Sequence, residues 1–145
     1  MNTIAENAKK IYPRAGRTVI RDAALFAVGG TGYYLAEVLF RGYSHWSMAL
    51  CGGVCLTLIF HINKKMSGKK ILLRALAGAG MITAVELTCG CIVNLALGWE
   101  VWDYSHMPMN ILGQICLPFT LLWFCVCIPV CAVCGKVCGR KDRRD

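Results

Sequence analysis

Four long apolar stretches place the strongest constraint on how this chain of 145 residues can fold. Only three charged residues, Glu37, Arg74 and Glu86, lie inside them. A helix rises about 1.5 Å per residue, so about 20 apolar residues span the hydrocarbon core of a bilayer. Helices are expected because backbone groups find no hydrogen-bond partners in lipid. The predicted spans are Ala23–Phe40, Trp46–Ile62, Ile71–Leu97 and Ile111–Cys134.

The composition supports the same fold class. Hydrophobic residues make up 57% of the chain and charged residues 17%, against about 45–50% and about 25% in typical globular chains. A globule of this length has too little interior to hide so much apolar surface. We therefore predict an all-α integral membrane bundle of four transmembrane helices over residues 23–134. Basic segments that we expect in the cytoplasm flank it, at residues 1–22 and 135–145.

The net charge of +8 is distributed unevenly about these spans. In a four-span protein, the two ends and the segment between spans two and three share one side of the membrane. That side carries all but one of the 16 Lys and Arg residues, the exception being Arg41. The positive-inside rule then places both termini in the cytoplasm. The basic residues lie where anionic lipid headgroups attract them, so we expect a lipid bilayer as partner and no nucleic acid.

Most of the ten cysteines lie within the predicted spans. A disulfide framework belongs on the oxidising face of a membrane, so none is expected here. Spacings of four, three and four residues place one group on a single helix face: Cys127, Cys131, Cys134 and Cys138. We interpret this row as small apolar residues at a helix contact, with a metal or redox site as the alternative. No metal and no cofactor is expected.

Two segments of the chain look like copies of one unit. Tyr43-Ser44-His45 precedes Gly52, and Tyr104-Ser105-His106 precedes Gly113, with seven residues from His to Gly in each case. Two spans separate the copies, so they share a direction across the membrane. This pattern predicts two parallel helical-hairpin repeats, although such a short match also arises by chance.

Two glutamates inside the spans are the most informative polar residues. Glu37 lies four residues before Arg41, so these side chains meet on one helix face. Glu86 begins a second stripe, in which Gly90, Asn94 and Gly98 follow at intervals of four. A carboxylate near the bilayer centre costs about 2.5–3.5 kcal/mol and usually faces the bundle or a watery cavity. We predict an outward-opening polar cavity with Glu37 and Glu86 at its base; the alternative is pairing that fixes helix register.

Further polar residues complete the candidate site. Asn110 and Gln114 lie four residues apart at the predicted start of the fourth span. The predicted substrate- or ion-binding set is Glu37, Arg41, Glu86, Asn94, Asp103, Asn110 and Gln114, with His45, His106, Tyr104 and Ser105 as secondary candidates. Zinc bound by His45, His106 and Asp103 is an alternative. Nine glycines are expected to let helices approach closely: Gly29, Gly30, Gly32, Gly52, Gly53, Gly78, Gly80, Gly90 and Gly113.

One string in the second half of the chain resembles a known family. It reads Trp-Asp-Tyr-Ser-x2-Pro-x-Asn-x2-Gly-x-Ile-Cys-Leu and runs from Trp102 to Leu117, between Glu86 and Trp123. It is similar to the family named Putative ABC-transporter type IV, small bacterial membrane proteins described as ABC transporter permeases. The resemblance implies transport in a bacterial cell membrane with a separate ATPase as partner. The short loop Asn63–Lys70 offers no coupling helix, so such an ATPase would have to dock on the termini.

We therefore expect a small polytopic membrane protein of transport type and not an enzyme. An oligomer, or assembly with other membrane subunits, is expected because four spans alone make a thin shell around a pathway. One alternative is a membrane-embedded enzyme that acts on lipid or cell-wall precursors at the outer face, with His45, His106 and Asp103 as catalytic groups. Another is a non-catalytic assembly or regulatory subunit, in which the polar stripes hold helices together.

Overall fold

The computed structural model describes residues 2–142, and it describes side chains for residues 16–137. Several residues of the predicted basic segments and one cysteine therefore fall outside the described side chains: Lys9, Lys10, Arg14, Cys138, Arg140, Lys141, Arg143 and Arg144.

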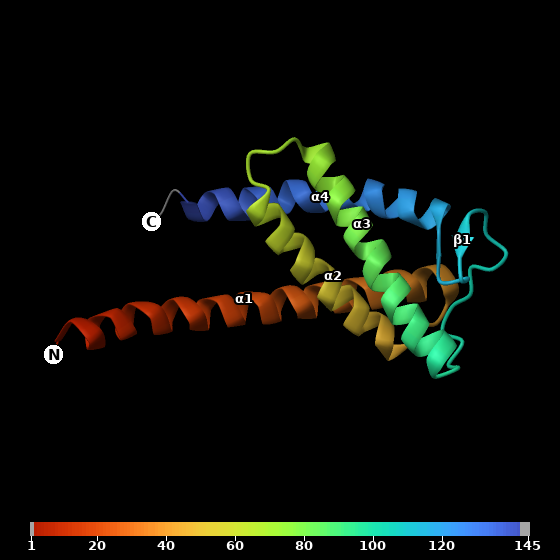
Figure 1. Ribbon diagram of the computed structural model, residues 1–145, viewed down its shortest axis with the longest axis horizontal. Coiled ribbons are helices and arrows are strands. Elements are labelled where there is room, and N and C mark those ends of the chain that lie inside the picture. The colour runs from red at the N-terminus through yellow and green to blue at the C-terminus, as the bar shows by residue number, and fades with distance from the viewer. Residues whose placement is uncertain (1, 143–145) are drawn as a thin grey trace.

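Four helices dominate the chain, as predicted: α1 (Asn2–Arg41), α2 (Trp46–Lys65), α3 (Ile71–Gly90) and α4 (Leu117–Asp142). A π-helix, η1 (Cys91–Ala96), continues α3, and two short strands, β1 (Asn110–Ile111) and β2 (Ile115–Cys116), precede α4. Four segments are long and apolar enough to cross a membrane, namely Gly16–Arg41, Trp46–Lys65, Ile71–Ala96 and Leu117–Val137. The chain is thus an α-helical bundle of four spans, and the start of α1 and the end of α4 lie at the same end of the bundle (Figure 1).

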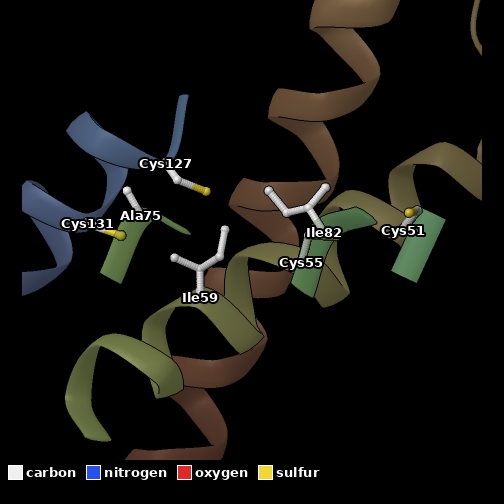
Figure 2. Packing of buried hydrophobic residues seen from close by; sticks show 7 residues of the cluster. All are labelled: Cys51, Cys55, Ile59, Ala75, Ile82, Cys127 and Cys131. Carbon is white, nitrogen blue, oxygen red and sulfur yellow. The ribbon is translucent and has the colours of Figure 1, made fainter. Parts of the chain in front are cut away.

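The helices pack in chain order, with α1 against α2 and α4 against α3. α2 and α3 run side by side through the middle of the bundle (Figure 1), and α2 also contacts α4. One buried cluster joins α2, α3 and α4, and Figure 2 shows its members: Cys51, Cys55, Ile59, Ala75, Ile82, Cys127 and Cys131. None of the cysteines between residues 16 and 137 forms a disulfide. Cys127 and Cys131 have no exposed surface, which matches the interpretation of this row as a helix contact.

Glycines bring α1 and α2 into backbone contact. A Cβ atom added to Gly29 would lie 2.5 Å from the carbonyl oxygen of Gly52, and one added to Gly30 would lie 2.6 Å from that of Ala49. Such small residues let membrane helices approach closely. The prediction was wrong for Gly32 and Gly80, because nothing in the described part of the chain lies within 4 Å of a Cβ added at either position.

The fourth helix begins later than predicted. α4 starts at Leu117 and not at Ile111, because a β-hairpin precedes it, in which Ile111 pairs with Ile115. Leu112 and Gly113 at its turn have φ angles of 54° and 67°, a left-handed conformation that ends a right-handed helix. Asn110 and Gln114 therefore do not form a helical stripe; they lie on β1 and in the hairpin turn.

The stripe that begins at Glu86 also ends early. The chain forms η1 from Cys91 onward, and Gly98 lies beyond its last residue with a φ angle of 65°. A π-helix has more residues per turn than an α-helix, so the spacing of four no longer keeps Asn94 directly above Glu86. The repeat remains a prediction: His45 caps α2 and Gly52 lies inside that helix, whereas Gly113 occupies a hairpin turn.

Candidate functional site

The loop between η1 and α4 is held together by its own polar side chains. The Asp103 carboxylate accepts hydrogen bonds from the backbone N–H of Ser105, at 2.8 Å, and from its hydroxyl. The hydrogen bonds from Ser105 hold the pKa of Asp103 below its usual value. The Asn110 amide donates to the carbonyl oxygens of Ser105 and Met107, at 3.1 and 2.9 Å. Glycine suits position 113, because its φ angle of 67° is left-handed and a Cβ there would lie 2.8 Å from Asp103 Oδ1.

A second network fixes this loop to the end of η1. Asn94 Nδ2 donates to the Trp102 carbonyl at 3.0 Å and to Gln114 Oε1 at 2.7 Å. Asn94 Oδ1 accepts the backbone N–H of Val101 at 2.7 Å, and Trp102 Nε1 donates to the Gln114 carbonyl at 2.9 Å. Gln114 and Trp102 are buried, with 3% and 5% of their surface exposed. These amide groups satisfy buried backbone groups that would otherwise lack partners.

Glu86 joins three helices. Its carboxylate accepts a hydrogen bond from Tyr33 Oη of α1 at 3.0 Å and another from Trp123 Nε1 of α4 at 2.9 Å. The rings of Tyr33 and Trp123 stack with their centroids 5.5 Å apart. Glu86 is 3% exposed, so this carboxyl group lies inside the bundle and two neutral donors face it.

A small pocket lies beside the start of α2, at the end of the bundle that carries the loop between η1 and α4. We call it the loop-end pocket; its volume is about 170 Å³, and it is lined by Glu37, Arg41, Tyr43, Ser44, His45, Trp99, Glu100 and Val101. Arg41 Nη1 lies 2.7 Å from Glu37 Oε1, and the Ser44 hydroxyl donates to the other carboxylate oxygen. Arg41 Nη2 donates to the Val101 carbonyl at 2.8 Å. Arg41 therefore ties α1 to the loop between η1 and β1.

The rings of Tyr43, His45 and Trp99 also line the loop-end pocket, and Trp46 lies beside His45 without lining it. The His45 ring lies 5.3 Å from both the Trp46 and the Trp99 ring, centroid to centroid. His45 Nδ1 accepts the Ser47 backbone N–H at 3.3 Å and so caps the first turn of α2. This acceptor role leaves Nε2 as the nitrogen that carries the proton in neutral His45.

The structure gathers only part of the predicted site. Glu37, Arg41 and His45 line the loop-end pocket, whereas Glu86 lies elsewhere in the bundle and does not line it. Five further candidates belong to the loop networks: Asn94, Asp103, Asn110, Gln114 and Ser105. Tyr104 stacks on Phe119, with centroids 4.6 Å apart, and burial raises the pKa of its phenol.

The zinc alternative and the enzyme alternative both require His45, His106 and Asp103 to lie close together. Within residues 16–137, no group of three His, Cys, Asp or Glu side chains comes together in a way that could hold a metal ion. This covers the zinc alternative, since His45, His106 and Asp103 all lie in that range. The loop-end pocket contains His45 but neither His106 nor Asp103, so the proposed enzymatic trio does not share it.

The sequence did not predict several of the polar contacts. The partners of Glu86, Tyr33 and Trp123, lie on other helices 53 and 37 residues away. No local spacing reveals such pairs. His61 was also overlooked, although its Nε2 lies 3.1 Å from Asp22 Oδ2. A histidine near the end of an apolar span was the available signal.

The four long apolar helices identify the class of the chain, a multi-pass α-helical membrane protein. The chain belongs to the family described as Putative ABC-transporter type IV, whose profile matches residues 33–141. Family and fold together make it a membrane protein of transport type. No curated protein and no solved structure matches the chain. The matched region includes both the loop-end pocket and the loop between η1 and α4.

Proposed function

We propose that this transport-type protein receives a small cationic group of its solute in the loop-end pocket. The supporting observation is the makeup of that pocket, which joins two carboxylates to one guanidinium and three aromatic rings. Glu37 and Glu100 outweigh Arg41 by one negative charge when His45 is neutral. Aromatic faces beside carboxylates attract ammonium groups, because the ring quadrupole adds to the charge attraction.

The size of the pocket limits the ligand to a small group. A volume of about 170 Å³ corresponds to about six water molecules at their share of liquid volume. A substituted ammonium group fits this space, whereas a large solute would enter only with its charged end. The proposal thus rests on Glu37 and Glu100, and Glu86 takes a different part, as a contact between helices.

Binding of choline, used as a quaternary ammonium probe, tests this proposal. We expect saturable binding of radiolabelled choline to the purified protein in nanodiscs. Glu37→Gln and Glu100→Gln should each weaken it by at least about tenfold, because a carboxylate about 8 Å from a cation contributes about 2 kcal/mol at an effective dielectric of about 20.

Asp103→Asn is the matched control, since it removes a loop carboxylate that does not line the pocket. It should leave choline affinity within about twofold of the wild type. Equal affinity in Glu37→Gln and the wild type would contradict the proposal, and so would an equal loss in Asp103→Asn. Glu100 is exposed, so its variant tests the charge without disturbing the Glu37–Arg41 pair.

We also propose that the pocket faces outward and both termini face the cytoplasm of a bacterial cell. The support is the distribution of Lys and Arg residues, of which only Arg41 belongs to the pocket end. The termini would then be available to a separate ATPase. Much of α1 is exposed within one chain, which leaves room for other copies or membrane subunits.

Reporter fusions after Asp145 test this orientation. Green fluorescent protein fused there should fluoresce, because it folds in the cytoplasm, whereas alkaline phosphatase should stay inactive because its disulfides form outside. The same reporters placed after Arg41, in chains truncated there, should give the reverse result. An active phosphatase after Asp145 would overturn the orientation.

A further inference from the structure

Arg74 is a charged residue inside the bundle with little to neutralise it. It lies in the first turn of α3, partly buried, and its Nη1 donates to Asn63 Oδ1 at 3.2 Å. Its Nε is buried and has no hydrogen-bond partner among the described residues. No ion pair between residues 16 and 137 includes Arg74. A guanidinium has five N–H donors, so the chain itself satisfies this group only in part.

The neighbours of Arg74 hold it in place but carry no negative charge. Asn63 is 1% exposed, and its amide nitrogen donates to the Ile59 carbonyl at 2.9 Å and contacts Cys131 Sγ at 3.1 Å. This leaves the Asn63 oxygen directed at Arg74. On α4, a Cβ added to Gly135 would lie 3.0 Å from Arg74 Nη1. The guanidinium therefore lies against α4 where glycine leaves room for it.

The adjoining parts of α2 and α3, and α4 up to Lys141, add positive charge and no acid. The sequence has no Asp or Glu between His61 and Val85, or in α4 before Asp142. Four exposed lysines precede Arg74 closely in the chain and a fifth follows Gly135 on α4: Lys64, Lys65, Lys69, Lys70 and Lys136. Unpaired charges at membrane depth are costly, and basic sites between spans bind the headgroups of anionic lipids.

We propose that the phosphate group of an anionic phospholipid binds at Arg74, between the start of α3 and the later part of α4. Exposed apolar side chains on both helices, including Leu73, Leu76, Val133 and Val137, offer a surface along which acyl chains would lie. That surface favours a lipid over free phosphate or the carboxylate of a soluble partner. The site is at the opposite end of the bundle from the loop-end pocket and does not depend on the function proposed for it.

Thermal unfolding of the purified full-length chain in detergent, with added lipid, tests this assignment. We expect wild type to bind phosphatidylglycerol at least about fivefold more tightly than phosphatidylcholine, a ratio typical of one basic residue near a charged surface. The affinities follow from the lipid dependence of the unfolding temperature. Inorganic phosphate at the same concentration should cause no such stabilisation.

Arg74→Gln should abolish the preference, while Arg17→Gln should preserve it. Arg17 is exposed on α1 at the same end of the bundle, so its variant makes the same change in net charge away from the site. Arg74→Lys keeps the charge but loses the planar fork that matches a phosphate, so the preference should fall at least about twofold. If Arg74→Gln cannot be purified, this lysine variant decides the question.

Four results would overturn the proposal. They are no lipid preference in the wild type, an unchanged preference in an Arg74 variant, an equal loss in Arg17→Gln, and the full effect with inorganic phosphate alone. The last result would identify a site for the free anion. If the wild type showed no lipid preference, the remaining candidate ligand of Arg74 would be the carboxylate of a protein partner.

Discussion

Gly52→Val is expected to separate α1 from α2 and to destabilise the bundle by about 3 kcal/mol or more. Overpacking usually costs about 1–3 kcal/mol, and here the obstacle includes backbone. A Cβ on Gly52 would overlap the Tyr33 Cβ and lie 2.7 Å from the Gly29 carbonyl oxygen. Because Tyr33 also donates to Glu86, moving α1 away would break this hydrogen bond as well. Thermal unfolding in detergent, followed by circular dichroism, measures the loss.

Gly32→Val is the matched control on the neighbouring helix. It makes the same substitution in a membrane-spanning helix, but a Cβ added there meets nothing within 4 Å in the described chain. Its unfolding temperature should therefore stay near that of the wild type. Equal stability of the two valine variants would mean that the close contact between α1 and α2 is absent from the folded protein.

The difference between these two glycines illustrates what the sequence can and cannot predict. Both lie in apolar stretches, and the composition of each stretch is enough to predict a span. Whether a glycine faces lipid or another helix depends on how two helices rotate about their axes. A single sequence contains no direct record of that rotation, so Gly32 and Gly52 received the same prediction and only one was right.

Local pairs were easier to predict than distant ones. Glu37 and Arg41 are four residues apart in one helix, so helix geometry alone brings them together, and they form a 2.7 Å ion pair. The position of Gln114 depended instead on a β-hairpin whose apolar residues, Ile111 and Leu112, resemble the start of a span. Its turn has left-handed φ angles at Leu112 and Gly113, and Leu112 is a residue type that rarely adopts them.

The family string has a structural explanation. Its polar residues Asp103, Ser105 and Asn110 hydrogen-bond within one loop, and Gln114 fastens that loop to Asn94. We predicted that the polar residues of this string line a binding site, because polar residues near a membrane often bind ligands. In the structure these side chains hydrogen-bond mainly within the loop between η1 and α4, and the residues of the loop-end pocket come from less distinctive parts of the chain.

Glu86→Leu is expected to lower stability by about 2–5 kcal/mol, because two donors inside the bundle would lose their acceptor. A buried polar group left without a partner costs about 1–3 kcal/mol, and both the Tyr33 hydroxyl and the Trp123 N–H donate to Glu86. Glu86→Gln keeps one carbonyl oxygen in the same place. Its cost should therefore be about 1 kcal/mol, measured by the same thermal unfolding.

A double-mutant cycle with Tyr33→Phe separates the hydrogen bond from the loss of packing. Alone, Tyr33→Phe removes one donor and leaves Glu86 bonded to Trp123, at a cost of about 1 kcal/mol. In the Glu86→Leu background the Tyr33 hydroxyl has already lost its acceptor, so removing it should cost nothing or restore stability. We expect a coupling energy of at least about 1 kcal/mol. Additive losses, or equal stability of the leucine and glutamine variants, would show that Glu86 does not connect α1 to α4 and would return it to the list of candidate transport residues.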